Sequence, residues 1–234
     1  MKLAIMQPYF LPYLGYFQLI HAVDKFVVYD NIQFTKKGWI NRNRILVNGA
    51  AEYITLPLDK DSDFLNVDQR KLADSFKTER VKLLRRIGEA YRKAPQFNTI
   101  FPFIESIIKV EEQNLFGFIY QSLQAICQFL DIKTEFIISS SLPVDPQLRS
   151  QDKVIAICET LQVSQYINPI GGVELYAKEI FEQHNIKLNF IRSDAVDYTQ
   201  FANEFVPWLS IMDVMMFNSK EKVKGYLQNN YTII

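Results

Sequence analysis

The chain has 234 residues, which suits one large domain or one domain with a subdomain and leaves enough length to bury a sizeable core. Lys plus Arg and Asp plus Glu both number 26, so the formal charge is zero and a general nucleic-acid-binding surface is disfavoured. Aromatic residues make up 14%, whereas histidine occurs only twice, so the chain is poor in its usual near-neutral acid–base group.

The scarce residues exclude several classes of site. Cys127 and Cys158 lie in apolar helical runs, so we interpret them as buried thiols of a cytosolic protein rather than as nucleophiles or zinc ligands. The sequence contains no G-x-S-x-G, H-E-x-x-H or G-x-x-x-x-G-K-[ST] motif. Serine hydrolase, zincin and P-loop functions therefore lose their local evidence, and we predict no metal site.

The N-terminus is apolar but does not read as a signal peptide. Gln7, Pro8 and Pro12 interrupt the apolar stretch, and no uninterrupted run approaches the roughly 18 apolar residues of a spanning helix. We therefore expect a cytoplasmic protein with no membrane insertion.

The first 30 residues predict a strand–helix–strand unit. Residues 2–6 read as a short buried strand, residues 11–24 carry apolar residues at helical spacing, and residues 25–30 form a second strand. Such a unit points to a parallel sheet whose ligands bind at the carboxyl ends of the strands, here Gln7-Pro8 and 29–31.

The middle of the chain predicts a hairpin and then helices. Two strand-like runs flank Asn48-Gly49, a favourable pair for a tight turn. From residue 68 to about 132 the pattern becomes helical, and the expected segments are 76–94, 101–113 and 114–130, the second continuing after Pro102.

In the last third of the chain predicted strands and helices alternate again. The expected strands are 133–140, 164–170 and 186–193, and the expected helices are 150–163, capped by Ser150, and 172–185. We predict a single α/β domain over residues 1–234, with a Rossmann-like, mostly parallel sheet flanked by helices and a helical insertion at about 68–131.

Residues 7–17 form the first candidate site segment. Two prolines fix an unusual backbone path after the first strand, and Gly15 permits close approach of a ligand or chain segment. The tyrosines at 9, 13 and 16 could instead form a core cluster, but a core has no use for Gln7 and leaves the phenolic hydroxyls seeking partners.

Residues 30–44 form the second candidate segment. The segment begins with a carboxylate at a strand end, which is the expected position of a base or metal ligand in an α/β site. Its cations can bind phosphate or carboxylate, its amides can bind sugar hydroxyls, and Trp39 offers a stacking face. The alternative is that these groups pair internally to fix a long loop. The polar members of the segment are Asp30, Asn31, Gln33, Lys36, Lys37, Asn41, Arg42, Asn43 and Arg44.

Two weaker signals come later in the chain. Gly171-Gly172, after Asn168 and ahead of a predicted helix, could offer free N–H groups to an anion or could simply form a tight turn. Asp213 lies among apolar residues, so it either pairs structurally with an arginine or assists the site.

Together the segments MQPYFLPYLGYFQLI, VDKFVVYDNIQFTKKGWINRNRI, YINPIGGVELY and SIMDVMMFN resemble the WbqC-like family of bacterial proteins over essentially the whole chain. The resemblance implies a role in the synthesis of O-antigen and related surface polysaccharides, with a glycine or aminoacyl transferase acting on amino sugars as the suggested activity.

A more distant similarity links the chain to nucleotidyltransferases of the HIGH superfamily. Tyr13-Leu14-Gly15-Tyr16 stands where those enzymes carry H-x-G-H, between the first strand and a helix. Tyrosine brings no positive charge near neutral pH, and Ser139-Ser140-Ser141 lacks the lysines of a K-M-S-K-S loop, so adenylyl transfer is the second hypothesis. A non-catalytic nucleotide-sugar binding module is the third.

The leading hypothesis is a transferase of a small acyl or aminoacyl unit onto a nucleotide-linked amino sugar. No fixed cofactor is required, although a nucleotide or activated acyl donor takes part, and the partner is a small-molecule substrate. We predict Asp30, as base, and Lys36 as catalytic residues. The predicted substrate-binding residues are Gln7, Tyr13, Gly15, Tyr16, Gln33, Lys37, Trp39, Asn41, Arg42, Arg44, Asn168, Gly171 and Gly172.

Overall fold

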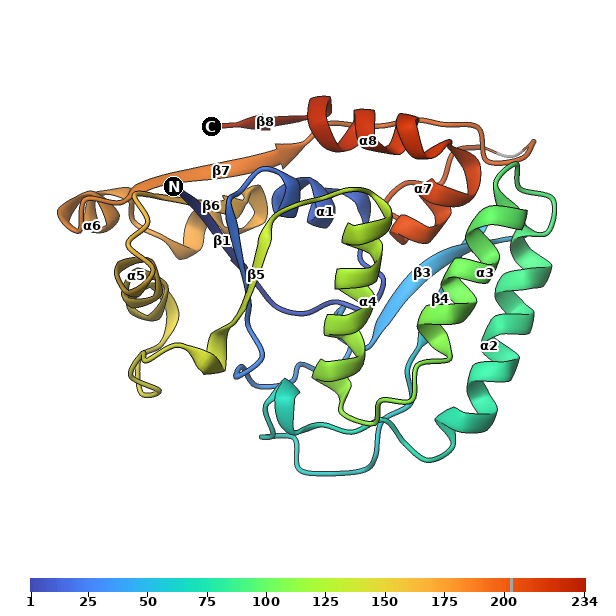
Figure 1. Cartoon of the computed structure of the whole chain (residues 1–234), viewed down its shortest axis with the longest axis horizontal. Helices are drawn as coiled ribbons and strands as arrows, with labels where there is room; N and C mark the ends of the chain where they lie inside the picture. Colours follow the sequence, from blue (N-terminus) through green and yellow to red (C-terminus); the bar gives the residue numbers. More distant parts are fainter. Residues whose placement is uncertain (203) are drawn as a thin grey trace.

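The protein is built on a six-stranded sheet, seen in a computed structural model that describes residues 1–202 and 204–234. Its strands stand in the order β5-β2-β1-β6-β7-β8, and all except β8 run parallel (Figure 1). The strands are β1 Lys2–Met6, β2 Lys25–Val28, β5 Glu135–Ile138, β6 Gln165–Pro169, β7 Lys187–Ser193 and β8 Tyr231–Ile233. The predicted α/β, Rossmann-like, mostly parallel sheet flanked by helices is confirmed.

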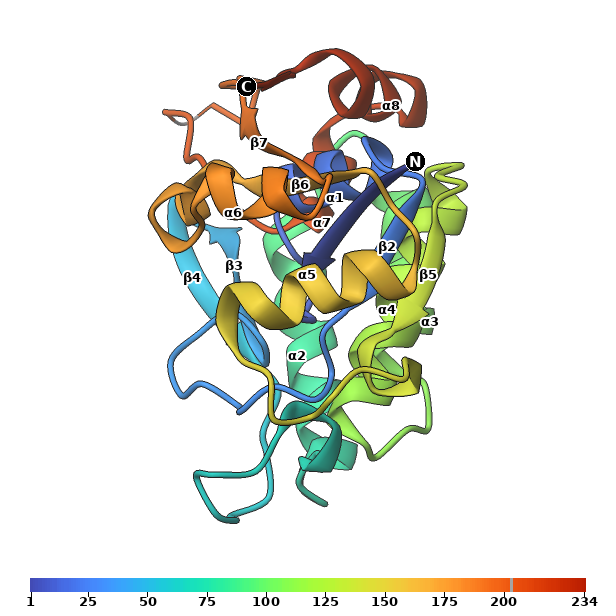
Figure 2. The same cartoon turned by 90° about the vertical axis from the view of Figure 1, so that its left-hand side faces the viewer.

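Helices cover both faces of the sheet (Figure 2). Leu3 and Ile5 pack with α5 and α6 on one face, whereas Ala4 belongs to the larger core formed with α1, α4, α7 and α8. Burial on both faces explains why the strand sequences are apolar almost throughout. The helices are α1 Leu14–His21, α4 Leu115–Phe129, α5 Ser150–Thr160, α6 Lys178–Gln183, α7 Ile211–Phe217 and α8 Lys220–Asn229.

Between β2 and β5 the chain forms a hairpin and then three helices. Strands β3 (Arg42–Val47) and β4 (Ala50–Thr55) pair antiparallel, and both turn residues have positive φ, 51° at Asn48 and 80° at Gly49. The predicted turn is therefore confirmed.

The three helices predicted between the hairpin and β5 are also present: α2 Phe76–Tyr91, α3 Phe97–Ile108 and α4. Helix α3 continues after Pro102 to Ile108 as predicted, but it begins earlier, at Phe97, so the proline lies inside the helix and removes one of its hydrogen bonds. Burial of the apolar face that includes Ile100 and Ile104 offsets this loss.

The predicted helix over residues 172–185 is wrong in extent. The chain forms a 3-10 helix over Ile170–Leu175, passes through extended backbone at Tyr176 and only then enters α6. The Tyr176 ring packs 5.8 Å from the ring centroid of Tyr166 and 5.7 Å from that of Phe181, so core packing overrides the helical pattern.

Two predicted helix ends also differ from the structure. The helix expected to continue to Asp24 ends at His21. The cap of α5 is Arg149 instead of Ser150, which is itself the first helical residue and has a φ of 47°. Ser150 therefore supplies no cap through its side chain.

Asp213 is fully buried in α7, and its predicted arginine partner is wrong. Its carboxylate accepts hydrogen bonds of 2.7 Å from each of the Tyr91 hydroxyl, the Tyr198 hydroxyl and the Gln200 amide. Tyr91 also accepts a bond from the Leu46 N–H of β3, so the cluster joins α2, α7 and the hairpin. Neutral donors suit a buried carboxylate because they satisfy its oxygens without the desolvation of a second charge.

Both cysteines are buried, as predicted, and should be inert in the native protein. Burial raises the pKa of both thiols, that of Cys158 to about 12. Because the thiolate is the reactive form, we expect no alkylation by iodoacetamide near neutral pH and two alkylated sites after denaturation, counted by mass spectrometry. Rapid labelling of the folded chain would contradict this.

Two structural features are absent from residues 1–202 and 204–234. No helix there combines the length and the apolarity needed to cross a bilayer. No three side chains of the His, Cys, Asp and Glu types gather there in a way that could hold a metal ion.

Candidate functional site

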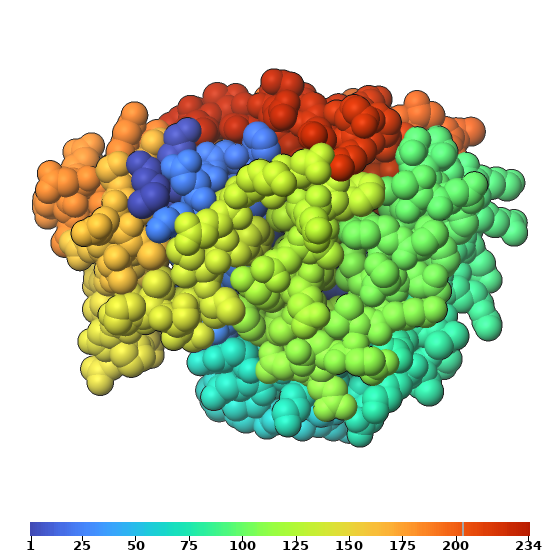
Figure 3. Space-filling model, viewed as in Figure 1, coloured from blue at the N-terminus to red at the C-terminus, as the bar shows by residue number. Residues whose placement is uncertain are grey.

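A cavity of about 840 Å³ lies at the carboxyl ends of β1, β2 and β6. The strand order reverses between β1 and β6, because β2 follows β1 on one side and β6 joins it on the other. Open α/β sheets bind ligands at such a switch point. In Figure 3 the surface is notched at the lower left, between the yellow segment before α5 and the cyan segment around residues 60–70, and both segments contribute to the cavity wall.

Two cationic side chains, Arg149 and Lys153, line this cavity. Lys153 is only 4% exposed, and its Nζ lies 3.3 Å from Asn31 Oδ1 and 4.7 Å from the centroid of the Tyr29 ring. Burial, reinforced by the charge of Arg149 and opposed by that of Asp30, lowers the pKa of Lys153. Neither cation forms an ion pair within the part of the chain that the structure describes, so the wall is prepared for an anionic ligand.

The N-terminus of α5 reinforces this positive wall. Its cap Arg149 and first residue Ser150 both line the cavity, and the Arg149 side chain does not cap the N–H groups of the first turn. The guanidinium of Arg149 donates to the carbonyl oxygens of Pro146 and Leu148, the latter at 2.8 Å. The positive end of the helix dipole therefore lies beside the two cations.

Amide side chains supply the neutral part of the wall. Asn168, at the end of β6, is 6% exposed, accepts a hydrogen bond of 3.1 Å from Tyr166 and donates one of 3.0 Å to the Pro169 carbonyl. Gln7 follows β1 on the same wall, and Asn31 follows β2. Amides can both donate to and accept from hydroxyl groups, so these side chains suit a sugar or another polyol.

The adjacent glycines give a matched pair of substitutions. A Cβ at Gly172 would come closer than 3.0 Å to Asn168 Nδ2, whereas a Cβ at Gly171 would meet nothing within 4 Å. We expect Gly172→Ala to lower the free energy of unfolding by about 1–3 kcal/mol and to displace the Asn168 amide. Gly171→Ala should change stability by less than about 0.5 kcal/mol. Urea unfolding compares the two, and equal losses would show that the Asn168 contact does not matter.

Five of the residues predicted from the sequence as substrate-binding come together on the wall of this cavity. They are Gln7, Gln33, Asn168, Gly171 and Gly172. The two glycines lie within the 3-10 helix and do not begin a long helix, so the positive helix end at this cavity belongs to α5 instead.

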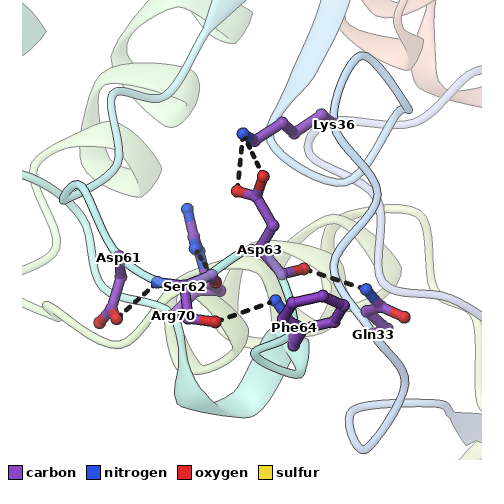
Figure 4. A network of polar contacts seen from close by, with 7 residues as sticks. All are labelled: Gln33, Lys36, Asp61, Ser62, Asp63, Phe64 and Arg70. Carbon is purple, nitrogen blue, oxygen red and sulfur yellow. Dashed lines mark hydrogen bonds and ion pairs between the residues drawn. The ribbon is translucent and has the colours of Figure 1, made fainter.

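The predicted catalytic residues lie elsewhere. Asp30 is 2% exposed, and its carboxylate accepts hydrogen bonds from the Ser140 N–H at 2.9 Å and the Ser140 hydroxyl at 2.5 Å. Lys36 pairs with Asp63 in an exposed ion pair of 2.6 Å (Figure 4). Asp30 therefore lies behind the wall, and Lys36 supports the loop that contains Asp63.

Residues 37–42 mostly fix their own loop. Arg42 donates to the carbonyl oxygens of Lys37 and Gly38, and its guanidinium lies 4.4 Å from the Tyr53 ring centroid. Asn41 donates to the Leu56 carbonyl at 2.9 Å. Lys37 is exposed and has a φ of 62°. Arg42 and Asn41 therefore follow the alternative in which the polar groups of this segment pair internally to fix a long loop.

Arg44 and Trp39 belong to a second pocket, of about 330 Å³, which shares Tyr9 with the large cavity. Arg44 donates to the Trp208 carbonyl at 3.2 Å, and its buried Nε finds no acceptor among residues 1–202 and 204–234. This aromatic pocket is lined by Tyr9, Tyr13, Trp39, Asn43, Arg44 and Trp208.

The residues of the tetrapeptide that stands in the place of H-x-G-H face different parts of the molecule. Tyr16 is 1% exposed, and its hydroxyl donates to the Gln7 carbonyl at 2.8 Å, so it lies in the core. Tyr13 and Gly15 line a third cavity, of about 270 Å³, and a Cβ at Gly15 would crowd Ser193 and the Tyr13 ring. The two phenols therefore do not face one ligand together.

Sequence reasoning missed Arg149 and Lys153. One signal could have indicated Lys153, because it stands one helical turn before Ile157, which is fully buried, and so shares the apolar face of its helix. A lysine at such a position is either buried with a partner or directed into a cavity.

Comparison with known proteins gives a family and a relative. Residues 7–225 match the model of the WbqC-like protein family. The chain is 29% identical over 230 residues, covering 97% of both chains, to a protein named "Uncharacterized protein Rv1507c" from Mycobacterium tuberculosis (strain ATCC 25618 / H37Rv). No solved structure matches the chain. Since the family model spans nearly all of the sequence, from the end of β1 into α8, the chain belongs to the WbqC-like protein family.

Proposed function

We propose that this protein is a transferase that attaches a small acyl or aminoacyl unit, such as glycine, to a nucleotide-linked amino sugar in surface-polysaccharide (O-antigen) synthesis. The observation that carries the proposal is the pair of cations without carboxylate partners, Arg149 and Lys153, on a wall that also presents amides. A sugar nucleotide carries the matching groups, since its diphosphate suits the cations and its hydroxyls suit the amides. A volume of about 840 Å³ is within the usual range for a ligand cavity.

The chemistry requires no covalent intermediate on the protein. The sugar amine attacks the acyl carbon and a C–N bond forms, while the leaving group of the donor departs with the electrons of the bond that breaks. The proton that the nitrogen gives up passes to the leaving group. Lys153 and Arg149 hold the diphosphate, so the amine reacts from a fixed position. In this proposal Asp30 acts through Lys153, because the negative charge of Asp30 favours the protonated form of the Lys153 side chain.

The aromatic pocket supplies a place for the second substrate. It shares the wall residue Tyr9 with the large cavity, so the two pockets are neighbours. The free Nε of Arg44 suits a carbonyl or carboxylate oxygen, and the exposed ring of Trp39 offers a stacking face. We assign the acyl or aminoacyl donor to this pocket.

The test is a reaction of the purified protein with UDP- and dTDP-linked amino sugars and a panel of acyl and aminoacyl donors, read by mass spectrometry. The expected result is an amide product without consumption of ATP. Release of pyrophosphate from ATP in the presence of an amino acid would instead support adenylation. Saturable binding of sugar nucleotides with no turnover of any donor would support a binding module.

A further inference from the structure

Two exposed apolar side chains line the large cavity. Among the large apolar side chains that the structure describes, Phe64 (83% exposed) and Leu175 (69% exposed) are the two most exposed, and both line this cavity. Transfer of such side chains out of water is favourable, so the two residues suit a ligand with an apolar part that covers them. The two residues come from distant segments, the loop before Val67 and the end of the 3-10 helix after β6.

The loop that presents Phe64 is held by hydrogen bonds on both sides of the ring. Before it, the Asp63 carbonyl accepts from the Gln33 amide at 3.0 Å, and after it, the Leu65 carbonyl accepts from the Phe34 N–H at 3.0 Å. The Phe64 N–H itself donates to the Ser62 hydroxyl at 3.3 Å.

Charged side chains tie the same loop from two further directions. Figure 4 shows Lys36 paired with the Asp63 carboxylate and Arg70 donating to the Ser62 carbonyl, the latter at 3.0 Å. The backbone around Phe64 is therefore anchored at successive residues, so the exposed ring is held at the cavity wall.

The cavity thus combines exposed apolar side chains with two cations at the start of α5. A ligand that fits both has a flat apolar ring joined to a group with negative charges. We infer that Phe64 and Leu175 hold the nucleobase of a nucleoside diphosphate whose phosphates bind Arg149 and Lys153. The inference rests on the proposed function and adds the part of the substrate that this function leaves unassigned. Contact through ring faces tolerates different bases, so discrimination among bases should be modest.

The experiment compares UDP with inorganic pyrophosphate by isothermal titration calorimetry. Phe64→Ala should weaken UDP binding roughly tenfold or more, the usual loss when a stacking ring is removed, and should leave pyrophosphate binding unchanged. Phe64→Trp should restore UDP binding, and Leu175→Ala should weaken it by a smaller factor. Tyr53→Ala is the matched control, because Tyr53 is an exposed aromatic residue (46%) outside this cavity.

The outcomes separate this inference from the proposal beneath it. Wild-type protein that binds neither UDP nor pyrophosphate overturns the proposed function and the inference together. UDP binding that survives Phe64→Ala, or pyrophosphate binding that falls in parallel with it, overturns the assignment of the base alone. Because Phe64 is mostly in solvent, its replacement should leave the melting temperature nearly unchanged.

Discussion

Lys153→Met is expected to weaken the binding of a nucleoside diphosphate by about 10- to 100-fold, because a hydrogen bond to a charged group contributes about 1.5–3 kcal/mol. Methionine keeps an unbranched apolar stem in the buried position, so the fold should tolerate the change. Arg149→Gln should cause a loss of similar size. Titration calorimetry at several salt concentrations measures both, and the salt dependence of binding should become shallower in each variant.

The control for Lys153→Met is Lys36→Met. Lys36 is an exposed cation of the same type, but its partner is Asp63 on the Phe64 loop. The loss of the Lys36 charge should leave pyrophosphate affinity unchanged within about twofold, since Lys36 does not line the large cavity. Equal losses of pyrophosphate affinity in the two variants would show that the phosphates bind near Lys36 and the Phe64 loop as well as at the start of α5.

The pH dependence of binding follows from the same lysine. Its pKa is lowered, so in the free protein the charge on Lys153 is lost at a lower pH than for an ordinary lysine. Diphosphate affinity should therefore fall as the pH rises through that pKa, and the fall should be absent in Lys153→Met. A profile identical in the two proteins would show that another group titrates.

Asp213→Ala should produce the largest loss of stability of any substitution considered, about 3 kcal/mol in the free energy of unfolding, because it leaves buried donors without an acceptor. The orphaned groups are the hydroxyls of Tyr91 and Tyr198, while the Gln200 amide keeps a bond to the Val206 carbonyl. The melting temperature should fall by about 6–12 °C, measured by calorimetry.

Tyr198→Phe provides the comparison for Asp213→Ala. It removes one donor and leaves the carboxylate two others, so the loss should be about 1 kcal/mol. Combining the two substitutions should cost less than the sum, because they remove the same hydrogen bond. Strict additivity would argue against that bond.

Asp213 also gives the stability a defined dependence on pH. Burial raises the pKa of its carboxyl, and the three donors oppose the shift without cancelling it. The folded-state pKa therefore exceeds the unfolded value of about 3.9, so the stabilising contribution is complete below the unfolded pKa and is lost as the pH rises through the folded one. Asp213→Asn cannot ionise, and urea unfolding across this range should show that the wild-type advantage over it shrinks with rising pH.

The sequence predicted most of the elements because their signals are local. Alternating and continuous apolar runs identified the strands, and Asn48-Gly49 identified the hairpin through the positive φ that both residues require. The predicted helix over residues 172–185 was too long, because Tyr176 has extended backbone that brings its ring against those of Tyr166 and Phe181. Contacts of that kind depend on how the chain after β6 folds back onto it, and no helical periodicity encodes them.

The candidate site also has one part that local sequence signals predict and one part that depends on tertiary structure. By itself the sequence determined the fold class and the strand ends where polar residues gather, including Gln7 and Asn168, since periodicity and chain order are properties of the sequence. Only the tertiary structure decided which cations line the cavity. It turned Arg42 inward to its own loop and brought Arg149 and Lys153 to the cavity. The physical reason is the strand order, because the insertion of β6 beside β1 carries the start of α5 to the switch point and so places a buried lysine on the cavity wall.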